Sequence, residues 1–314
     1  MIARKAIRIA DSVVNTAVLL IVVALLAIGG YALWDSSQVY DAASAARYET
    51  YKPGDSGEDQ TFEELKAINS DVFAWLTVYG THIDYPVAQG QDNMKYVNTD
   101  AEGRYSLSGS IFLDEGSSKD FSDFSSIFYG HHMEQNAMFG EIGLFVDKAY
   151  FDARRYGALY YSEQWHGLEF FAFLRADAYD NAVFRVKIEG EEAQQEYLAL
   201  LLAMADHTRD IGVTTADRIV LLSTCSPSPT NGRDILVGRI TDEIYENPFA
   251  EEEQTGDNED SVDAASLWAI ILPVVAVAGL AMIVILVLLR RKRRKRKDEE
   301  AAEKNSEHED NEVP

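Results

Sequence analysis

Cys225 is the single cysteine of the 314-residue chain, and it is the first candidate for chemistry. It ends the predicted strand that starts at residue 218, and Arg233 opens a second apolar run, residues 234–238. A lone cysteine has no partner for a disulfide within its chain, so it is either a reactive thiol or a small buried hydrophobe. Since a thiol is only partly ionised at neutral pH, a nucleophilic cysteine needs a base or a cation beside it.

His131 has the sequence context that best suits such a base. It follows the apolar run 126–129 and Gly130, which places an imidazole at the end of a predicted strand, where the backbone can turn sharply. If the chain stays extended, His132 points to the opposite side. Taken alone, each signal also fits a residue without a catalytic role: a histidine that is hydrogen-bonded or exposed, or a surface arginine at 233. The other histidines are predicted in turns, on a helix surface or in the tail: His82, His166, His207 and His308.

Two long apolar segments indicate that the chain crosses a membrane. Residues 13–34 and 264–289 carry no charge, and each is long enough to cross a hydrocarbon core of about 30 Å as a helix. Basic residues precede the first segment, and the basic run 290–297 follows the second. The positive-inside rule then predicts a cell-membrane protein with both termini in the cytoplasm and the residues between the segments outside.

Each apolar segment has an alternative interpretation. For the first it is a cleaved signal peptide, but the nearest small-residue cleavage pattern, residues 43–45, stands well beyond the apolar stretch. For the second it is the terminal signal of a protein that is itself attached to a cell wall. The sequence Glu-Gln-Thr-Gly at 253–256 is not preceded by the Leu-Pro that such a terminal signal would have, and the tail beyond Leu289 is longer than a stop-transfer sequence requires. Both observations weaken this alternative. We therefore expect two membrane anchors.

The chain is expected to hold one folded domain. The predicted parts, in order, are a cytoplasmic N-terminus (1–12), a transmembrane helix (13–34), a helical stalk (35–60), the folded domain (61–249), an acidic linker (250–263), a second transmembrane helix (264–289) and a cytoplasmic tail, basic then acidic and disordered (290–314). The net charge is −24, and most of the carboxylates lie between the apolar segments. A polyanion such as nucleic acid is therefore an implausible partner.

Within residues 61–249 the pattern is typical of a mainly β domain. A capping-box sequence at 61–64 predicts a short helix to residue 67, short helices are predicted in 138–151, and residues 191–204 are the best helix. Strands are predicted at 73–79, 82–87, 110–113, 125–129, 158–162, 168–176, 218–224 and 234–240, with a turn around 166–167. Many short strands with few helices favour a closed, largely antiparallel β-barrel with peripheral helices.

Together, these signals resemble one family. The run Leu-Ser-Thr-Cys at 222–225, the following Arg233 and the run Tyr-Gly-His at 129–131 are similar to the Cys, His and Arg triad of sortases, the cysteine transpeptidases on the outer face of Gram-positive bacteria. The segments that resemble class B sortases, in order, are 68–76, 83–87, 105–114, 121–123, 129–133 and 138–140. The resemblance covers about residues 61–249.

Some features resemble class C, the pilin polymerases, instead. The loop 226–232, the run 236–239 and a carboxy-terminal membrane segment are more usual there. Against class C, an Asp-Pro-aromatic lid ahead of the barrel is missing from the sequence. The resemblance therefore leaves open whether the substrate is anchored to peptidoglycan or polymerised into a pilus.

The resemblance implies an eight-stranded sortase barrel with Cys225, His131 and Arg233 converging at one end of a groove. Cys225 would cleave a sorting motif after its Thr and form a thioacyl intermediate, His131 would serve as acid and then base, and Arg233 would bind the Thr region or the oxyanion. Ser223 shares a face of its strand with Cys225, while Thr224 points the other way, so Ser223 is a candidate substrate-binding residue.

The implied partners are exported proteins with a carboxy-terminal sorting motif and an amine acceptor on peptidoglycan or a pilin. A thiol protease acting on the same motif is one alternative function, and a non-catalytic, membrane-tethered binding module is another. With one cysteine and scattered histidines, the sequence predicts no metal site and no cofactor. Calcium assistance, which the resemblance implies for some sortases, is not expected here.

Overall fold

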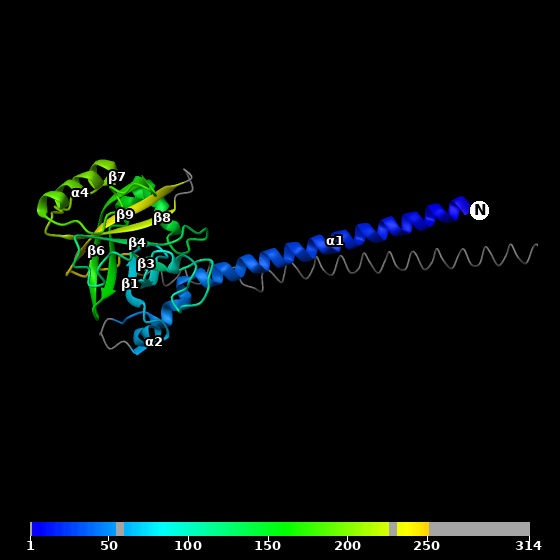
Figure 1. The fold of residues 1–314 in the computed structure, drawn as a ribbon, viewed down its shortest axis with the longest axis horizontal. Coiled ribbons are helices and arrows are strands. Elements are labelled where there is room, and N and C mark those ends of the chain that lie inside the picture. The colour runs from blue at the N-terminus through cyan, green and yellow to red at the C-terminus, as the bar shows by residue number, and fades with distance from the viewer. Residues whose placement is uncertain (1, 55–59, 226–230, 251–314) are drawn as a thin grey trace, which may run out of the picture. The chain divides into compact units, whose positions relative to one another are not determined.

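The computed structural model describes residues 2–54, 60–225 and 231–250. Within these residues, eight strands close into a barrel in the spatial order β5-β1-β2-β3-β4-β8-β9-β6, and β6 pairs back with β5 (Figure 1). The strands are β1 Val72–Val78, β2 Asp84–Ala88, β3 Ile111–Leu113, β4 Ser125–Tyr129, β5 Tyr156–Tyr161, β6 Gln164–Asp177, β8 Arg218–Cys225 and β9 Gly232–Thr241. The predicted closed eight-stranded barrel is confirmed.

The long strand β6 completes the barrel and carries an additional strand. Its first half pairs with β5, and its second half pairs, on the same edge, with the short strand β7, Ala205–Thr208. Most neighbours are antiparallel, but β2 runs parallel to β3 and β4 runs parallel to β8. The parallel β4–β8 pair matters for the site, because it brings the ends of two distant segments to the same end of the barrel.

The described residues also form helices outside the barrel. They are α1 Ile2–Ala43, α2 Gln60–Ile68, α3 Lys148–Ala153 and α4 Glu191–Met204, with 3-10 turns η1 Ala45–Tyr51, η2 Lys95–Val97 and η3 Gly140–Val146. Among the described residues, one helix is long and apolar enough to cross a membrane, and it lies near the N-terminus. This agrees with the predicted segment 13–34, whereas the predicted segment 264–289 lies outside the described residues.

Alternation along the strands divides the apolar residues between two cores. On β8, Val220 and Leu222 belong to the core that fills the barrel, while Ile219 and Leu221 belong to a second core under α4. Side chains of a strand point alternately to opposite faces, so a strand buried on both faces reads as a continuous apolar run. This is why residues 219–222 are apolar without interruption, and why β8 is held firmly in place.

Several sequence predictions need correction. The β5–β6 turn is formed by Ser162 and Glu163, both with positive φ, instead of by residues 166–167. His166 therefore lies inside β6, is 6% exposed and stacks on Tyr161, so it is not a turn residue. His207 lies in the unpredicted strand β7 and not on a helix surface. Helix α2 already includes Gln60, so Thr61 is a residue of the helix and not its cap.

Candidate active site

The backbone of Cys225 lies directly opposite that of Arg233. The two residues are partners in the antiparallel ladder between β8 and β9, on either side of the connection 226–230 that lies outside the described residues. Opposed Cα atoms in such a ladder are within about 5.5 Å of each other. The strand pairing therefore fixes a thiol-bearing residue and a guanidinium-bearing residue at the same level of the barrel.

His131 reaches the same end of the barrel through the parallel pairing of β4 with β8. Tyr129 is the partner of Ser223 in this ladder, and the Gly130 amide donates to the Ser223 carbonyl at 3.2 Å. His131 is the next residue of the chain. The three residues singled out from the sequence, at 131, 225 and 233, thus come from three neighbouring strand ends, β4, β8 and β9.

The His131 ring is half-buried and held by one hydrogen bond to the backbone. Its Nε2 lies 2.8 Å from the carbonyl oxygen of Val97, the last residue of η2. A carbonyl can only accept, so Nε2 carries the proton. In the neutral ring, Nδ1 is then the basic nitrogen, and it is the atom that gains or loses a proton. The structure thereby selects one tautomer of this histidine.

The His131 backbone is fixed by a tight hairpin that follows β4. Phe139 donates its amide to the His131 carbonyl at 3.0 Å, and His132 forms a β-bridge with Met138. Gly140 closes the hairpin, because a Cβ there would stand 2.0 Å from the Met133 carbonyl oxygen. The glycine is therefore required by the close approach of two backbone segments.

A tyrosine and an aspartate add a polar network beside Arg233. The Tyr129 hydroxyl donates to Oδ2 of Asp114 at 3.1 Å, and the Asn93 amide donates to the same oxygen at 2.8 Å. Burial and the Asp114 carboxylate raise the pKa of Tyr129, while the positive charge of Arg233 opposes the increase. Tyr129 therefore stays a neutral hydrogen-bond donor close to the guanidinium. The sequence motifs did not single out Asp114 as a functional residue. Its place directly after an apolar run is, however, typical of a polar residue at the end of a strand.

Ser223 is buried at the same place, with a relative exposure of 1%. Its hydroxyl oxygen has no hydrogen-bond partner among the described residues, and neither does that of Thr224. Buried hydroxyls are normally paired. Within the part of the chain that the structure describes, Ser223 therefore has an unpaired hydroxyl two residues before Cys225 on the same strand, and its assignment as a substrate-binding residue stays a prediction.

The described residues contain no cluster of three or more His, Cys, Asp or Glu side chains that could hold a metal ion. The predictions that no metal and no cofactor take part stay predictions. What the arrangement can do is acyl transfer by a thiol, because it supplies a nucleophile position, a histidine with a defined basic nitrogen, and a fixed cation.

Known proteins are similar to this chain in fold and in sequence. No protein-family model matches the chain. Sortase B of Staphylococcus aureus is 30% identical over 181 residues, which make up 57% of this chain and 74% of that protein. The structure of sortase B from the type II pilus of Streptococcus pneumoniae is 45% identical, has a TM-score of 0.52, and the match covers 58% of this chain and 99% of the other. The structure of a Streptococcus pyogenes class B sortase involved in pilus biogenesis is 42% identical, with a TM-score of 0.53 and coverages of 57% and 97%.

Proposed function

Because the chain belongs to the class B sortases, we propose that it is a membrane-anchored cysteine transpeptidase whose reaction takes place where Cys225, His131 and Arg233 meet. The observation that carries the proposal is the convergence of three strand ends: Cys225 is paired with Arg233, and the residue before His131 is hydrogen-bonded to Ser223. A non-catalytic binding module would have no need of this combination of residue types.

In the first half of the proposed reaction, the Cys225 thiolate attacks the carbonyl carbon of the Thr in a sorting motif. The carbon–sulfur bond forms, the peptide C–N bond breaks, and the departing amine takes a proton from Nδ1 of protonated His131. The hydrogen bond from Nε2 to Val97 supports this role, since it leaves Nδ1 as the nitrogen that exchanges protons. The product of this half is a thioacyl enzyme.

In the second half, an amine acceptor attacks the thioacyl carbon. Neutral His131 takes a proton from the incoming amine, an amide bond forms, and the Cys225 sulfur leaves as thiolate. Arg233 is always charged and planar, so it is suited to bind the oxyanion of both tetrahedral intermediates or the Thr of the motif. Ser223 binds the motif through its hydroxyl.

The substrate we propose is a pilus subunit. The two pilus-associated sortases are 45% and 42% identical to this chain, whereas the Staphylococcus aureus sortase B is 30% identical. The class C-like loop at 226–232 points the same way. Anchoring of surface proteins to peptidoglycan is the second candidate. The apolar N-terminal helix supports membrane attachment, and the topology proposed is two transmembrane segments with the barrel outside the cell.

The function is tested with the purified full chain in detergent, a sorting-motif peptide library, and two acceptors: a pilin segment that carries a lysine and a peptidoglycan stem peptide. A pilus sortase yields the amide with the pilin lysine, and an anchoring sortase yields it with the stem peptide. Release of free acid alone, with both acceptors present, identifies a thiol protease instead. Peptide binding without cleavage identifies a binding module.

A further inference from the structure

The last residue of helix α1 and the residues that follow it pack against the barrel close to the His131 hairpin. Ala43 is fully buried and Tyr48, in η1, is 4% exposed, and both belong to the core that fills the barrel. Arg47 forms ion pairs with Asp100 and Glu102 on the connection between β2 and β3. The segment 43–51 is therefore docked on the domain through apolar and charged contacts.

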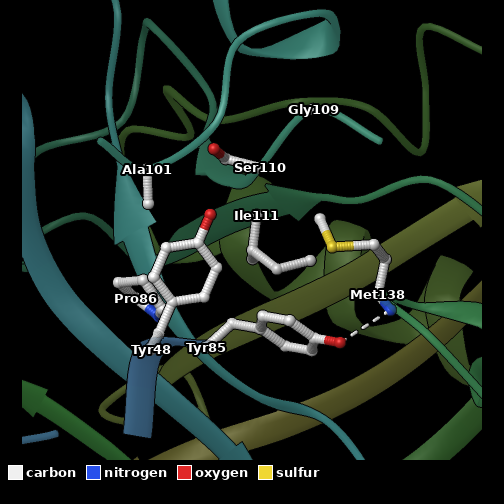
Figure 2. Close-up of a pocket in the computed structure, with 8 residues that line it drawn as sticks. All are labelled: Tyr48, Tyr85, Pro86, Ala101, Gly109, Ser110, Ile111 and Met138. Carbon is white, nitrogen blue, oxygen red and sulfur yellow. Dashed lines mark hydrogen bonds between the residues drawn. The ribbon is translucent and has the colours of Figure 1, made fainter. Parts of the chain in front are cut away.

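Tyr85 of β2 links this segment to the His131 hairpin. Its hydroxyl donates to the Ala43 carbonyl at 2.8 Å and accepts from the Met138 amide at 3.0 Å, the bond drawn dashed in Figure 2. Tyr48, Tyr85 and Met138 surround the same small cavity (Figure 2). Tyr85 is 2% exposed, so water cannot readily replace either bond.

Met138 is the point of the hairpin that most needs such support. Its φ is 54°, a left-handed conformation that is unfavourable for a side chain of this kind, and the side chain itself is buried. The residue pairs with His132, and the following residue, Phe139, holds the His131 carbonyl. A strained backbone persists only when its surroundings hold it. The Tyr85 hydroxyl supplies one of those restraints, because it accepts from the Met138 amide. Met138 directly precedes Phe139, whose amide holds the His131 carbonyl.

We propose that Tyr85 is a positioning residue for His131, and that the segment 43–51 completes its hydrogen bonding and so forms part of the catalytic apparatus. The proposal rests on the transpeptidase function proposed above. Without the Ala43 carbonyl, the proton of the buried Tyr85 hydroxyl would have no acceptor. The end of the membrane helix is thereby connected to the residue that moves protons in the reaction.

The test is Tyr85→Phe in the full chain, assayed in detergent with the sorting-motif peptide and the acceptor. Loss of one buried hydrogen bond to the hairpin is expected to lower kcat about tenfold, with KM changed less than about twofold. The control is Tyr79→Phe, which removes a hydroxyl that donates to the Tyr245 carbonyl at 3.3 Å, in a partly buried site away from His131. The control should leave kcat near the wild-type value, whatever it does to the melting temperature.

A second pair of variants loosens the segment 43–51 without touching the barrel core. Arg47→Gln removes the ion pairs that dock the segment, whereas Arg104→Gln removes pairs with the same two carboxylates from within the connection itself. The expected result is a fall in kcat of about threefold for Arg47→Gln and none for Arg104→Gln. This pair tests the role of the segment even if Tyr85→Phe does not fold.

The outcomes separate this inference from the proposed function. If the wild-type chain makes no amide and no thioacyl adduct, the proposed function fails, and the inference fails with it. If the wild type turns over while Tyr85→Phe and Arg47→Gln both keep the wild-type kcat, the inference alone is overturned. A change in KM without a change in kcat also overturns it, because a misplaced proton donor slows the chemical step.

Discussion

Arg233 lies directly opposite Cys225 across the antiparallel ladder of β8 and β9. The relationship follows from strand pairing, since the register runs without interruption from Arg218 and Ile240 to these two residues. A backbone fixed in this way limits where the guanidinium can lie, so less reorganisation is needed when negative charge develops on a carbonyl oxygen nearby. The pairing is therefore the part of the site that most directly suits stabilisation of an oxyanion.

Arg233→Lys should lower kcat by about a hundredfold, because lysine keeps the charge but loses the planar fork that can hold an oxyanion at two points. The measurement is the steady-state rate of amide formation. Arg175→Lys is the control, since the exposed Arg175 of β6 pairs with Asp206 of β7, and its rate should be that of the wild type. Near-normal turnover in Arg233→Lys would contradict a role in charge stabilisation.

Cys225→Ser should abolish the covalent intermediate and reduce turnover by at least about a thousandfold, because a hydroxyl is far less ionised than a thiol at neutral pH. Intact-protein mass spectrometry after incubation with the sorting-motif peptide provides the measurement. The wild type gains the mass of the acyl fragment, and the variant does not. Product at a wild-type rate from the serine variant would remove the thiol from the mechanism.

His131→Ala should be nearly as severe, because the departing amine then lacks a positioned proton donor. The rate of amide formation is the measurement, with His207→Ala as the control. His207 makes the same kind of bond, Nε2 to the Val146 carbonyl at 2.7 Å, but it lies on β7, outside the barrel proper. If the two variants lose activity equally, the effect of His131→Ala reflects stability and not acid–base catalysis.

Local patterns were sufficient for elements whose apolar residues face a core. The predicted strand 125–129 and the predicted helix 191–204 have the observed bounds, Ser125–Tyr129 and Glu191–Met204. Both are apolar where they contact a core and are bounded by residues that break the pattern. Short polar elements gave no such signal: β7 contains Ala, Asp, His and Thr, and it forms because β6 offers it a free edge.

Contacts between distant segments could not be derived from periodicity. Nothing local indicates that β4 pairs in parallel with β8, and the family resemblance supplied the expectation that His131 approaches Cys225. Likewise, Tyr85 reads as an ordinary strand aromatic, although its hydroxyl joins Ala43 to Met138. His166 was misplaced because Gly167 suggested a turn, whereas this glycine lies in β6, where a Cβ would collide with the Glu243 carbonyl.

His166 should make the domain less stable in mildly acidic solution. Burial, together with the nearby charge of Arg218, lowers its pKa from 6.5, and Asp242 opposes this only weakly. Both ring nitrogens lack hydrogen-bond partners among the described residues, and the ring stacks on Tyr161 at 4.1 Å. Because the unfolded chain binds the proton more tightly, the contribution of His166 to stability is complete above pH 6.5 and is lost as the pH falls from there towards the folded-state pKa.

The measurement is the urea midpoint of the full chain in detergent between pH 7.5 and pH 5, for the wild type and for His166→Phe, which keeps an aromatic ring on Tyr161. The wild-type midpoint should fall more steeply with decreasing pH than that of the variant, since only the wild type must bury a neutral imidazole. Parallel slopes for the wild type and His166→Phe would mean that His166 takes up its proton equally in the folded and unfolded chain.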